Sequence, residues 1–356
     1  MKICIVAGAR PNFVKVAPLI RAIKNTEGAT YELIYTGRRD DSTLEPSLFE
    51  DLQMPRPQVY FGIDSVKLNE ITSRVIEKFD NYLEYYHADV VIVVDDLAST
   101  MAAAITAKKR GIRVAHLVAG TRSFDMNMPK EVNRLVIDAL SDYLFTAGVK
   151  SNSVATREQG DAVENGEHKG GTYMVGNILM DTLRFNHTRL RKPDLDVEEG
   201  QYLVFTINRN ALLTDENKLR QLIDVIAETA GNMPIIAPLR NRALEVIAPY
   251  PSPLTILRPL PYLEFGWLTA HAHGIITDSG NVAEEATFNG VPCITLNSYT
   301  EHQETITVGS NVLVGEDPQR LKEEMERMVR GEWKKSALPD RWDGRSAERI
   351  VSILMQ

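Results

Sequence analysis

The chain has 356 residues, of which 44% are hydrophobic and 25% charged, and its formal net charge is -8. This length exceeds what one hydrophobic core usually organises, so two domains are expected. The negative charge argues against a general nucleic-acid binder, which needs a basic surface. No apolar stretch approaches the roughly 20 residues of a membrane helix, and the N-terminus does not resemble a signal peptide. These features favour a cytoplasmic protein that binds neither membranes nor nucleic acid.

The two cysteines, Cys4 and Cys293, both lie in apolar runs. Buried reduced thiols of a cytosolic protein are therefore favoured over a disulfide or a metal pair. No Cys/His spacing indicates zinc, so we expect no metal and no cofactor.

Apolar runs typical of strands alternate with helical patterns along almost the whole chain. The predicted strands are Lys2–Ala7, Tyr31–Tyr35, Val90–Val94, Arg113–Leu117, Tyr143–Thr146, Tyr202–Thr206, Pro234–Ala237, Leu254–Leu257, Gly274–Thr277 and Cys293–Leu296. The main predicted helices are Lys67–Tyr86, Thr100–Arg110, Lys130–Ser141, Asn217–Ala230, Tyr262–Ala270, Val282–Asn289 and Pro318–Arg330.

This alternation predicts an α/β protein with two Rossmann-like, doubly wound domains and a cleft where the domains face each other. We expect the first domain to span residues 1–168 and the second 169–338, because Glu164–Gly171 is polar, aperiodic and ends in two glycines. The last segment, 339–356, contains a helical pattern that could return to the first domain.

The first strand is followed by a turn at Gly8 and then by two cations, Arg10 and Lys15. Helix N-termini with adjacent cations bind anions, which suggests a phosphate-bearing ligand. A plain surface turn with two solvated cations is about equally consistent with the pattern.

Polar loops also follow other predicted strands. Asp95 and Asp96 end one strand, and Glu131 and Arg134 lie three apart on the next helix. In the second half, Ser279 precedes a helix whose free N–H groups could bind a second phosphate, and Glu285 suits a ribose. Each feature alone also has a structural explanation, as a cap or a surface ion pair, but together they favour a ligand-binding cleft.

In the order and spacing of such motifs, the chain resembles the non-hydrolysing UDP-N-acetylglucosamine 2-epimerase family, of the glycosyltransferase-B type, over essentially its whole length. The matching motifs are Gly8-Ala9-Arg10-Pro11, Lys15, Asp96 with Ser99-Thr100, Ala119-Gly120, Arg122-Ser123-Phe124, Met128-Pro129, Glu131, Asn133-Arg134, Val175-Gly176-Asn177, Thr277-Asp278-Ser279-Gly280, Glu284-Glu285, Thr300-Glu301 and Asp343-Gly344.

The resemblance implies an isomerase that inverts C2 of a UDP-N-acetylhexosamine by eliminating UDP and adding it back, without a redox cofactor. It implies that Asp96 and Glu131 are the acid/base carboxylates and that Arg10 and Lys15 assist at the diphosphate. It further implies cell-surface polysaccharide precursor synthesis and a homodimer formed through the first domain. The implied UDP-binding residues are Arg10, Lys15, Arg134, Arg209, Arg240, Ser279, Gly280, Asn281 and Glu285.

The sequence departs from the family pattern at chemically important positions. Val118 stands where the family has a glutamate, and Asn208 stands where it has a histidine. Arginines (Arg38, Arg39 and Arg240) lie in or beside segments where the family has histidines, and an arginine stays charged where a histidine would exchange protons.

These departures leave two alternatives to an active epimerase. One is a transferase or hydrolase acting on a nucleotide sugar, such as one with an acidic sugar, because guanidiniums bind carboxylates and phosphates in bidentate fashion. The other is a binding protein that has kept the nucleotide-sugar site and lost turnover.

Overall fold

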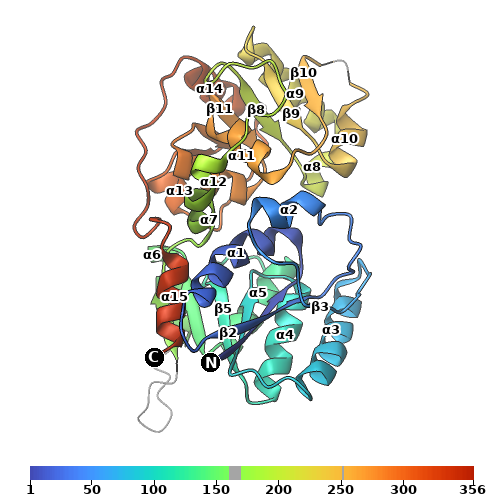
Figure 1. Cartoon of the computed structure of the whole chain (residues 1–356). Coiled ribbons are helices and arrows are strands. Elements are labelled where there is room, and N and C mark those ends of the chain that lie inside the picture. Colours follow the sequence, from blue (N-terminus) through green and yellow to red (C-terminus); the bar gives the residue numbers. More distant parts are fainter. Residues whose placement is uncertain (160–169, 251) are drawn as a thin grey trace. The chain divides into compact units, whose positions relative to one another are not determined.

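The computed structural model describes residues 1–159, 170–250 and 252–356, which form two α/β units (Figure 1). Unit 1 consists of Met1–Phe185 and Asp340–Gln356, and unit 2 consists of Asn186–Pro339.

The described part of unit 1 has a seven-stranded sheet in the order β3-β2-β1-β4-β5-β6-β7, with every pairing parallel. The order reverses between β1 and β4, where Ile5 pairs with Leu33 on one side and with Ile92 on the other. Ligands of doubly wound sheets bind outside the carboxyl ends of the strands at such a switch point. The strands are β1 (Lys2–Ala7), β2 (Thr30–Tyr35), β3 (Val59–Tyr60), β4 (Val90–Val94), β5 (Arg113–Ala119), β6 (Tyr143–Thr146) and β7 (Gly171–Met174).

Helices cover the faces of this sheet, whose central strand β4 is buried and apolar throughout, as is typical of a strand covered on both faces. Helix α3 contributes Val75 and Phe79 to a core that also contains the alanines of α4. The helices are α1 (Arg10–Lys24), α2 (Pro46–Asp51), α3 (Leu68–Leu83), α4 (Ala98–Lys109), α5 (Pro129–Leu140), α6 (Val149–Gln159), α7 (Leu179–Asn186) and α15 (Ser346–Leu354).

The described part of unit 2 has a six-stranded parallel sheet in the order β10-β9-β8-β11-β12-β13, which repeats the pattern of unit 1. Its switch point lies between β8 and β11, where Thr206 pairs with Thr277. The strands are β8 (Leu203–Thr206), β9 (Ile235–Pro238), β10 (Leu254–Leu257), β11 (Gly274–Thr277), β12 (Cys293–Thr295) and β13 (Asn311–Leu313). The helices are η1 (His187–Arg189), α8 (Asn210–Thr214), α9 (Glu216–Ala230), α10 (Asn241–Ile247), α11 (Tyr262–Ala270), α12 (Gly280–Asn289), α13 (Glu304–Thr307) and α14 (Pro318–Val329).

The predicted α/β class with two parallel, doubly wound sheets is confirmed. The sequence patterns missed β3, β7 and β13, which have two, four and three residues. All three lie at the edge of a sheet, where burial on fewer sides leaves a weaker apolar pattern.

The chain passes from unit 1 to unit 2 later than the boundary expected after residue 168. The proposed hinge, Glu164–Gly171, lies mostly outside the described residues. Strand β7 pairs with β6, and Thr182 of α7 donates a 2.6 Å hydrogen bond to the carbonyl of Val14. These contacts place the segment up to Phe185 in unit 1.

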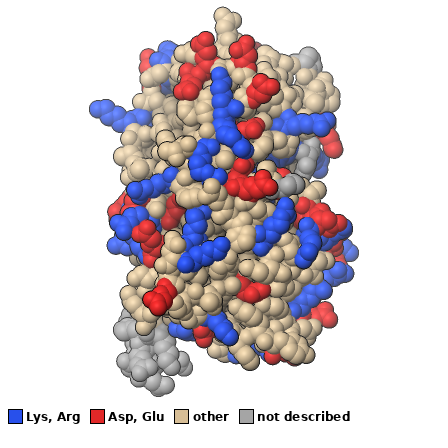
Figure 2. Space-filling view, in the orientation of Figure 1, with Lys and Arg blue, Asp and Glu red and all other residues tan. Residues whose placement is uncertain are grey.

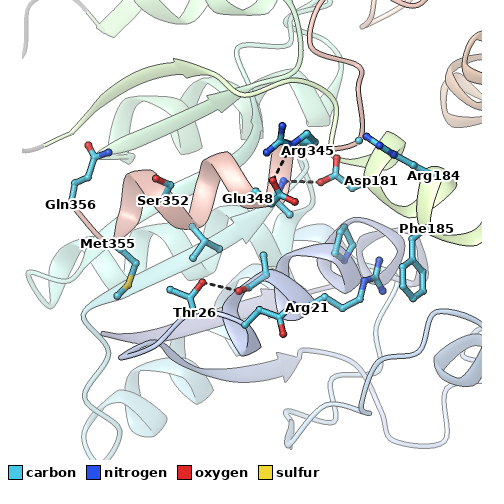
Figure 3. A pocket seen from close by; sticks show the side chains of 16 residues that line it. Arg21, Thr26, Asp181, Arg184, Phe185, Arg345, Glu348, Ser352, Met355 and Gln356 are labelled. Carbon is cyan, nitrogen blue, oxygen red and sulfur yellow. Dashed lines mark hydrogen bonds and ion pairs between the residues drawn. The ribbon is translucent and has the colours of Figure 1, made fainter.

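The terminal segment lies in unit 1, where α15 (red in Figure 1) packs beside α1 (blue). The indole of Trp342 is fully buried and donates a 3.1 Å hydrogen bond to the carbonyl of Ala147. Asp181 of α7 accepts hydrogen bonds from the backbone N–H groups of Ser346 and Ala347, at 3.1 and 2.8 Å. A cavity of about 1130 Å³ lies beside this contact, lined by α1, α7 and α15 (Figure 3).

On the face shown in Figure 2, Lys and Arg side chains are interspersed with Asp and Glu side chains. Within the described residues, no helix is both long and apolar enough to cross a bilayer. Cys4 and Cys293 are both buried and free, as the sequence predicted.

Candidate functional site

The first candidate group lies in the turn from β1 to α1. Glycine is favoured at position 8 because a Cβ atom there would lie 2.0 Å from Ser99 Oγ. The side chain of Asn12 closes the turn by accepting hydrogen bonds from the N–H groups of Gly8 and Ala9, at 2.9 and 3.1 Å. The chain itself therefore occupies these two N–H groups, which lie just before the N-terminus of α1.

Both cations of this turn are in ion pairs. Arg10 forms a bidentate pair with Glu45, with Nε 2.9 Å from Oε2. Lys15 is almost fully buried, and its ammonium lies 2.5 Å from Asp95 Oδ1. An anionic ligand would therefore share these cations with two carboxylates.

Asp96, Glu131 and Arg134 do come together at the carboxyl edge of the sheet. The guanidinium of Arg134 contacts Asp96 Oδ2 at 2.6 Å and Glu131 Oε2 at 3.2 Å. Burial acts to raise the pKa of Asp96, but the nearby cations Lys130 and Arg134 hold it below its usual range. Asp96 is thus an ionised carboxylate, which suits a base rather than an acid.

Glu131 is saturated with hydrogen bonds. It accepts from Ser123 N at 2.8 Å, Ser123 Oγ at 2.9 Å and Phe124 N at 3.1 Å, besides the contact with Arg134. Burial acts to raise the pKa of Glu131, but these hydrogen bonds stabilise the charged form and lower the pKa overall. In this conformation Glu131 anchors the loop after β5, in which Phe124 has a left-handed backbone (φ 62°).

A buried chain of polar contacts supports this edge from beneath. His116 contacts Asp138 Oδ1 at 2.5 Å, and Asp138 Oδ2 lies 2.7 Å from Arg122 and 3.0 Å from Gly120 N. Burial acts to raise the pKa of Asp138, but His116 and Arg122 lower it overall.

Val118, the residue in place of the family glutamate, has a left-handed backbone with φ 71°. It is the extra residue of a β-bulge, since the pairing of β5 with β6 shifts between Leu117 and Ala119. A β-branched side chain is a rare occupant of this region, and such strain clusters at functional sites. Position 118 therefore has the strained backbone that is common at functional sites, although the valine side chain cannot transfer a proton.

In unit 2, the turn between β11 and α12 forms the second candidate group. Ser279 caps α12 by accepting a hydrogen bond from Val282 N, as predicted. A Cβ atom at Gly280 would meet Glu301 Oε2 only at 3.7 Å, so neighbouring atoms do not require glycine there. Half-buried Asn281 follows in the first helical turn, and Glu285 is buried one turn later.

Asp278 joins this turn to the end of β8. Its carboxylate accepts from the N–H groups of Asn208 and Arg209 at 2.7 and 2.6 Å, and burial raises its pKa. The guanidinium of Arg209 pairs with Glu316. Arg209 Nε and Asn297 Oδ1 are buried without a hydrogen-bond partner among the described residues. Buried polar atoms of this kind are usually satisfied by a ligand or water. Arg240 precedes α10 as its N-cap residue.

Several residues of the site were not selected from the sequence. Asp138 extends the polar face of Glu131 and Arg134 by four residues, so helical spacing alone could have identified it. Glu45 and His302, which lies 3.3 Å from Glu284, carry no local signal because their partners are distant in sequence. Among residues 1–159, 170–250 and 252–356, no three His, Cys, Asp or Glu side chains gather as a metal site.

Residues 21–355 match the family model of UDP-N-acetylglucosamine 2-epimerase. The chain is 32% identical over 373 residues to the UDP-N-acetylglucosamine 2-epimerase of Methanocaldococcus jannaschii, with 99% of each chain covered. It is 32% identical over 321 residues to the UDP-2,3-diacetamido-2,3-dideoxy-D-glucuronate 2-epimerase of Pseudomonas aeruginosa, with 88% of each covered. It is also similar to the crystal structure of the M. jannaschii UDP-GlcNAc 2-epimerase in complex with UDP-GlcNAc and UDP, with a TM-score of 0.87, 32% identity, and 100% and 99% of the two chains covered.

Proposed function

The chain belongs to the UDP-N-acetylglucosamine 2-epimerase family, and from this premise we propose that it interconverts the C2 epimers of a UDP-N-acetylhexosamine. The agreement with the family along nearly the whole chain carries the proposal.

The reaction balances without an oxidant. A base takes the C2 proton while the C1–O bond breaks, and UDP leaves with that electron pair. The base passes its proton to water, a proton from water is added to C2 on the opposite face, and the UDP oxygen rebuilds the bond to C1. The site must supply a base near C2 and cations or N–H donors for the diphosphate.

We assign the base to Asp96. Its carboxylate is ionised because Arg134 and Lys130 stabilise the charged form. The diphosphate would contact Arg134, Arg10 and Lys15. It would then share with Glu45 and Asp95 the positive charges of Arg10 and Lys15, which these two carboxylates neutralise in the structure. Glu131 would hold the Ser123 loop and stabilise charge rather than carry a proton, since its oxygens already accept four hydrogen bonds.

We assign UDP binding in unit 2 to the turn at Ser279, Gly280 and Asn281. The free N–H groups at the start of α12 suit a phosphate, and the absent Cβ at Gly280 lets an anion approach the backbone closely. Glu285 would accept hydrogen bonds from ribose hydroxyls. Arg209 and Arg240 would add positive charge, and the unsatisfied Arg209 Nε supports a polar ligand there.

The direct test is to incubate the protein with UDP-N-acetylglucosamine in deuterated water and follow deuterium at C2 by NMR. We expect exchange and a mixture of epimers. Asp96→Asn should abolish exchange while retaining UDP binding by calorimetry. No exchange by the wild-type protein at high enzyme concentration would refute the proposed activity.

A second candidate is a diverged member that acts on an acidic nucleotide sugar. Two observations favour it: a relative named for a diacetamido-glucuronate substrate, and Arg39, exposed beside the ring of Tyr60 at 4.9 Å. The neighbouring Arg38 is already paired with Asp40 and Asp64. A panel of neutral and acidic UDP sugars, assayed for C2 exchange and for free UDP with and without acceptors, separates epimerase, hydrolase and transferase.

A third candidate, binding without turnover, is favoured by Val118 and Asn208. It predicts micromolar UDP-sugar affinity by calorimetry and no chemistry with any sugar of the panel.

We also propose a cytoplasmic homodimer formed through unit 1. Two free buried thiols are typical of a reducing compartment, and Val66, Leu68 and Tyr85 at the ends of α3 are exposed apolar side chains. Light scattering should give twice the monomer mass, and Leu68→Asp should reduce it. A monomer at micromolar concentration would exclude the dimer.

A further inference from the structure

His116 makes two hydrogen bonds from opposite sides of its ring. It is 1% exposed, and its Nδ1 lies 2.5 Å from Asp138 Oδ1 while its Nε2 lies 2.9 Å from the backbone carbonyl of Asp95. Both ring nitrogens are therefore engaged within the protein, so the ring is held in place and is not open to a substrate.

The carbonyl that His116 holds belongs to a residue with an unusual backbone. Asp95 has φ 58°, in the left-handed region that favours glycine. Its N–H donates to the carbonyl of Leu117 at 3.2 Å, and its carboxylate accepts from Lys15 at 2.5 Å and Asn12 at 2.8 Å. The turn after β4 is thus fixed through its N–H, its carbonyl and its side chain.

The next residue is Asp96, to which the proposed function assigns the base. Its carbonyl accepts a 2.8 Å hydrogen bond from Asn133 Nδ2, and its carboxylate faces Arg134. Two consecutive carbonyls of this turn are therefore held by side chains of β5 and α5. Losing the His116 contact would let the peptide between Asp95 and Asp96 rotate and move the carboxylate.

We propose that His116 is a positioning residue that fixes the left-handed turn at Asp95 and thereby sets the orientation of the Asp96 carboxylate and the Lys15 ammonium. The inference rests on the proposed function for its catalytic consequence, but its structural content is independent of that function. Asp138 acts with His116, because the same carboxylate binds Gly120 N and Arg122 and so ties the ring to the end of β5.

The catalytic consequence is tested with His116→Gln, whose amide reaches only one of the two acceptors. A displacement of a reacting group by about 1 Å costs on the order of 100-fold in rate, so kcat for C2 exchange should fall by about this factor. KM should change much less than kcat, because Lys15 is the only proposed diphosphate contact that depends on His116 and the binding groups of unit 2 are unchanged. The control is His273→Gln, since both ring nitrogens of His273 likewise contact oxygen atoms, here the carbonyls of Gly200 and Met328, but just before β11 in unit 2. It should keep the wild-type kcat.

A stability cycle tests the structural content without relying on activity. Glycine adopts φ 58° without help, so His116→Gln should lower the unfolding midpoint less in an Asp95→Gly background than in the wild-type chain. Equal losses in both backgrounds would overturn the proposal, as would a wild-type kcat in His116→Gln. If the wild-type protein shows no C2 exchange, the proposed function fails and the cycle alone decides this inference.

Discussion

Replacing Asp181 with asparagine should remove a pH dependence from the stability of unit 1. This carboxyl group is 7% exposed and caps the N-terminus of α15 through the N–H groups of Ser346 and Ala347 (Figure 3). Burial raises its pKa to about 6 from the ordinary 3.8, although the two N–H donors pull it down and only Asp343 adds to the rise.

The magnitude follows from linkage. The pKa is raised in the folded state, so folding binds a proton more tightly, and the resulting stabilisation is complete below the unfolded pKa of 3.8. It is lost as the pH rises through the folded value of about 6. A difference of about two pKa units corresponds to about 3 kcal/mol of unfolding free energy.

The assay is denaturant unfolding between about pH 4 and pH 7.5, with hydrogen exchange of the α15 amides as a local readout. Over this range the wild-type protein should lose most of this free energy, about 2.4 kcal/mol, relative to Asp181→Asn. Asp340→Asn is the matched control, because this variant makes the same chemical change at an exposed carboxyl group. Parallel stability curves for the wild-type protein and Asp181→Asn would refute the reasoning.

Three further predictions concern the backbone of the site. Gly8→Ala should destabilise unit 1 by about 2 kcal/mol through the clash with Ser99 Oγ, and Ser99→Ala should recover part of this loss, both measured by denaturant unfolding. Gly280→Ala should change the free energy of unfolding by no more than about 0.5 kcal/mol but weaken UDP binding by about tenfold in calorimetry. An unchanged affinity would refute the assignment of a phosphate to that turn. Val118→Asn should stabilise the chain by about 1 kcal/mol, because asparagine tolerates the left-handed backbone better than valine does. Val118→Glu combined with Asn208→His should raise the rate of C2 exchange if only those two groups limit it. A double variant no faster than the wild-type chain would show that the site differs in other ways.

Much of the fold was predictable because its signals are local. Fully apolar strands such as Val90–Val94 and the helices between them show themselves within a few residues of sequence, and their alternation specifies parallel sheets. The edge strands β3 and β7 and the boundary at Phe185 were not predictable, since they depend on pairing with segments elsewhere in the chain.

For the site, the sequence by itself determined which residue types stand after each strand: the turn at Gly8, Asp96, the Glu131–Arg134 pair and the serine cap of α12. Only the tertiary structure decided how they are used, because hydrogen bonds and ion pairs join groups that are distant in sequence. Arg10 meets Glu45 and Lys15 meets Asp95, so the two expected anion-binding cations are already neutralised. Val118 keeps a strained bulge that its sequence position did not reveal. Backbone conformation and long-range charge pairing follow from the packing of whole elements, and no window of sequence contains them.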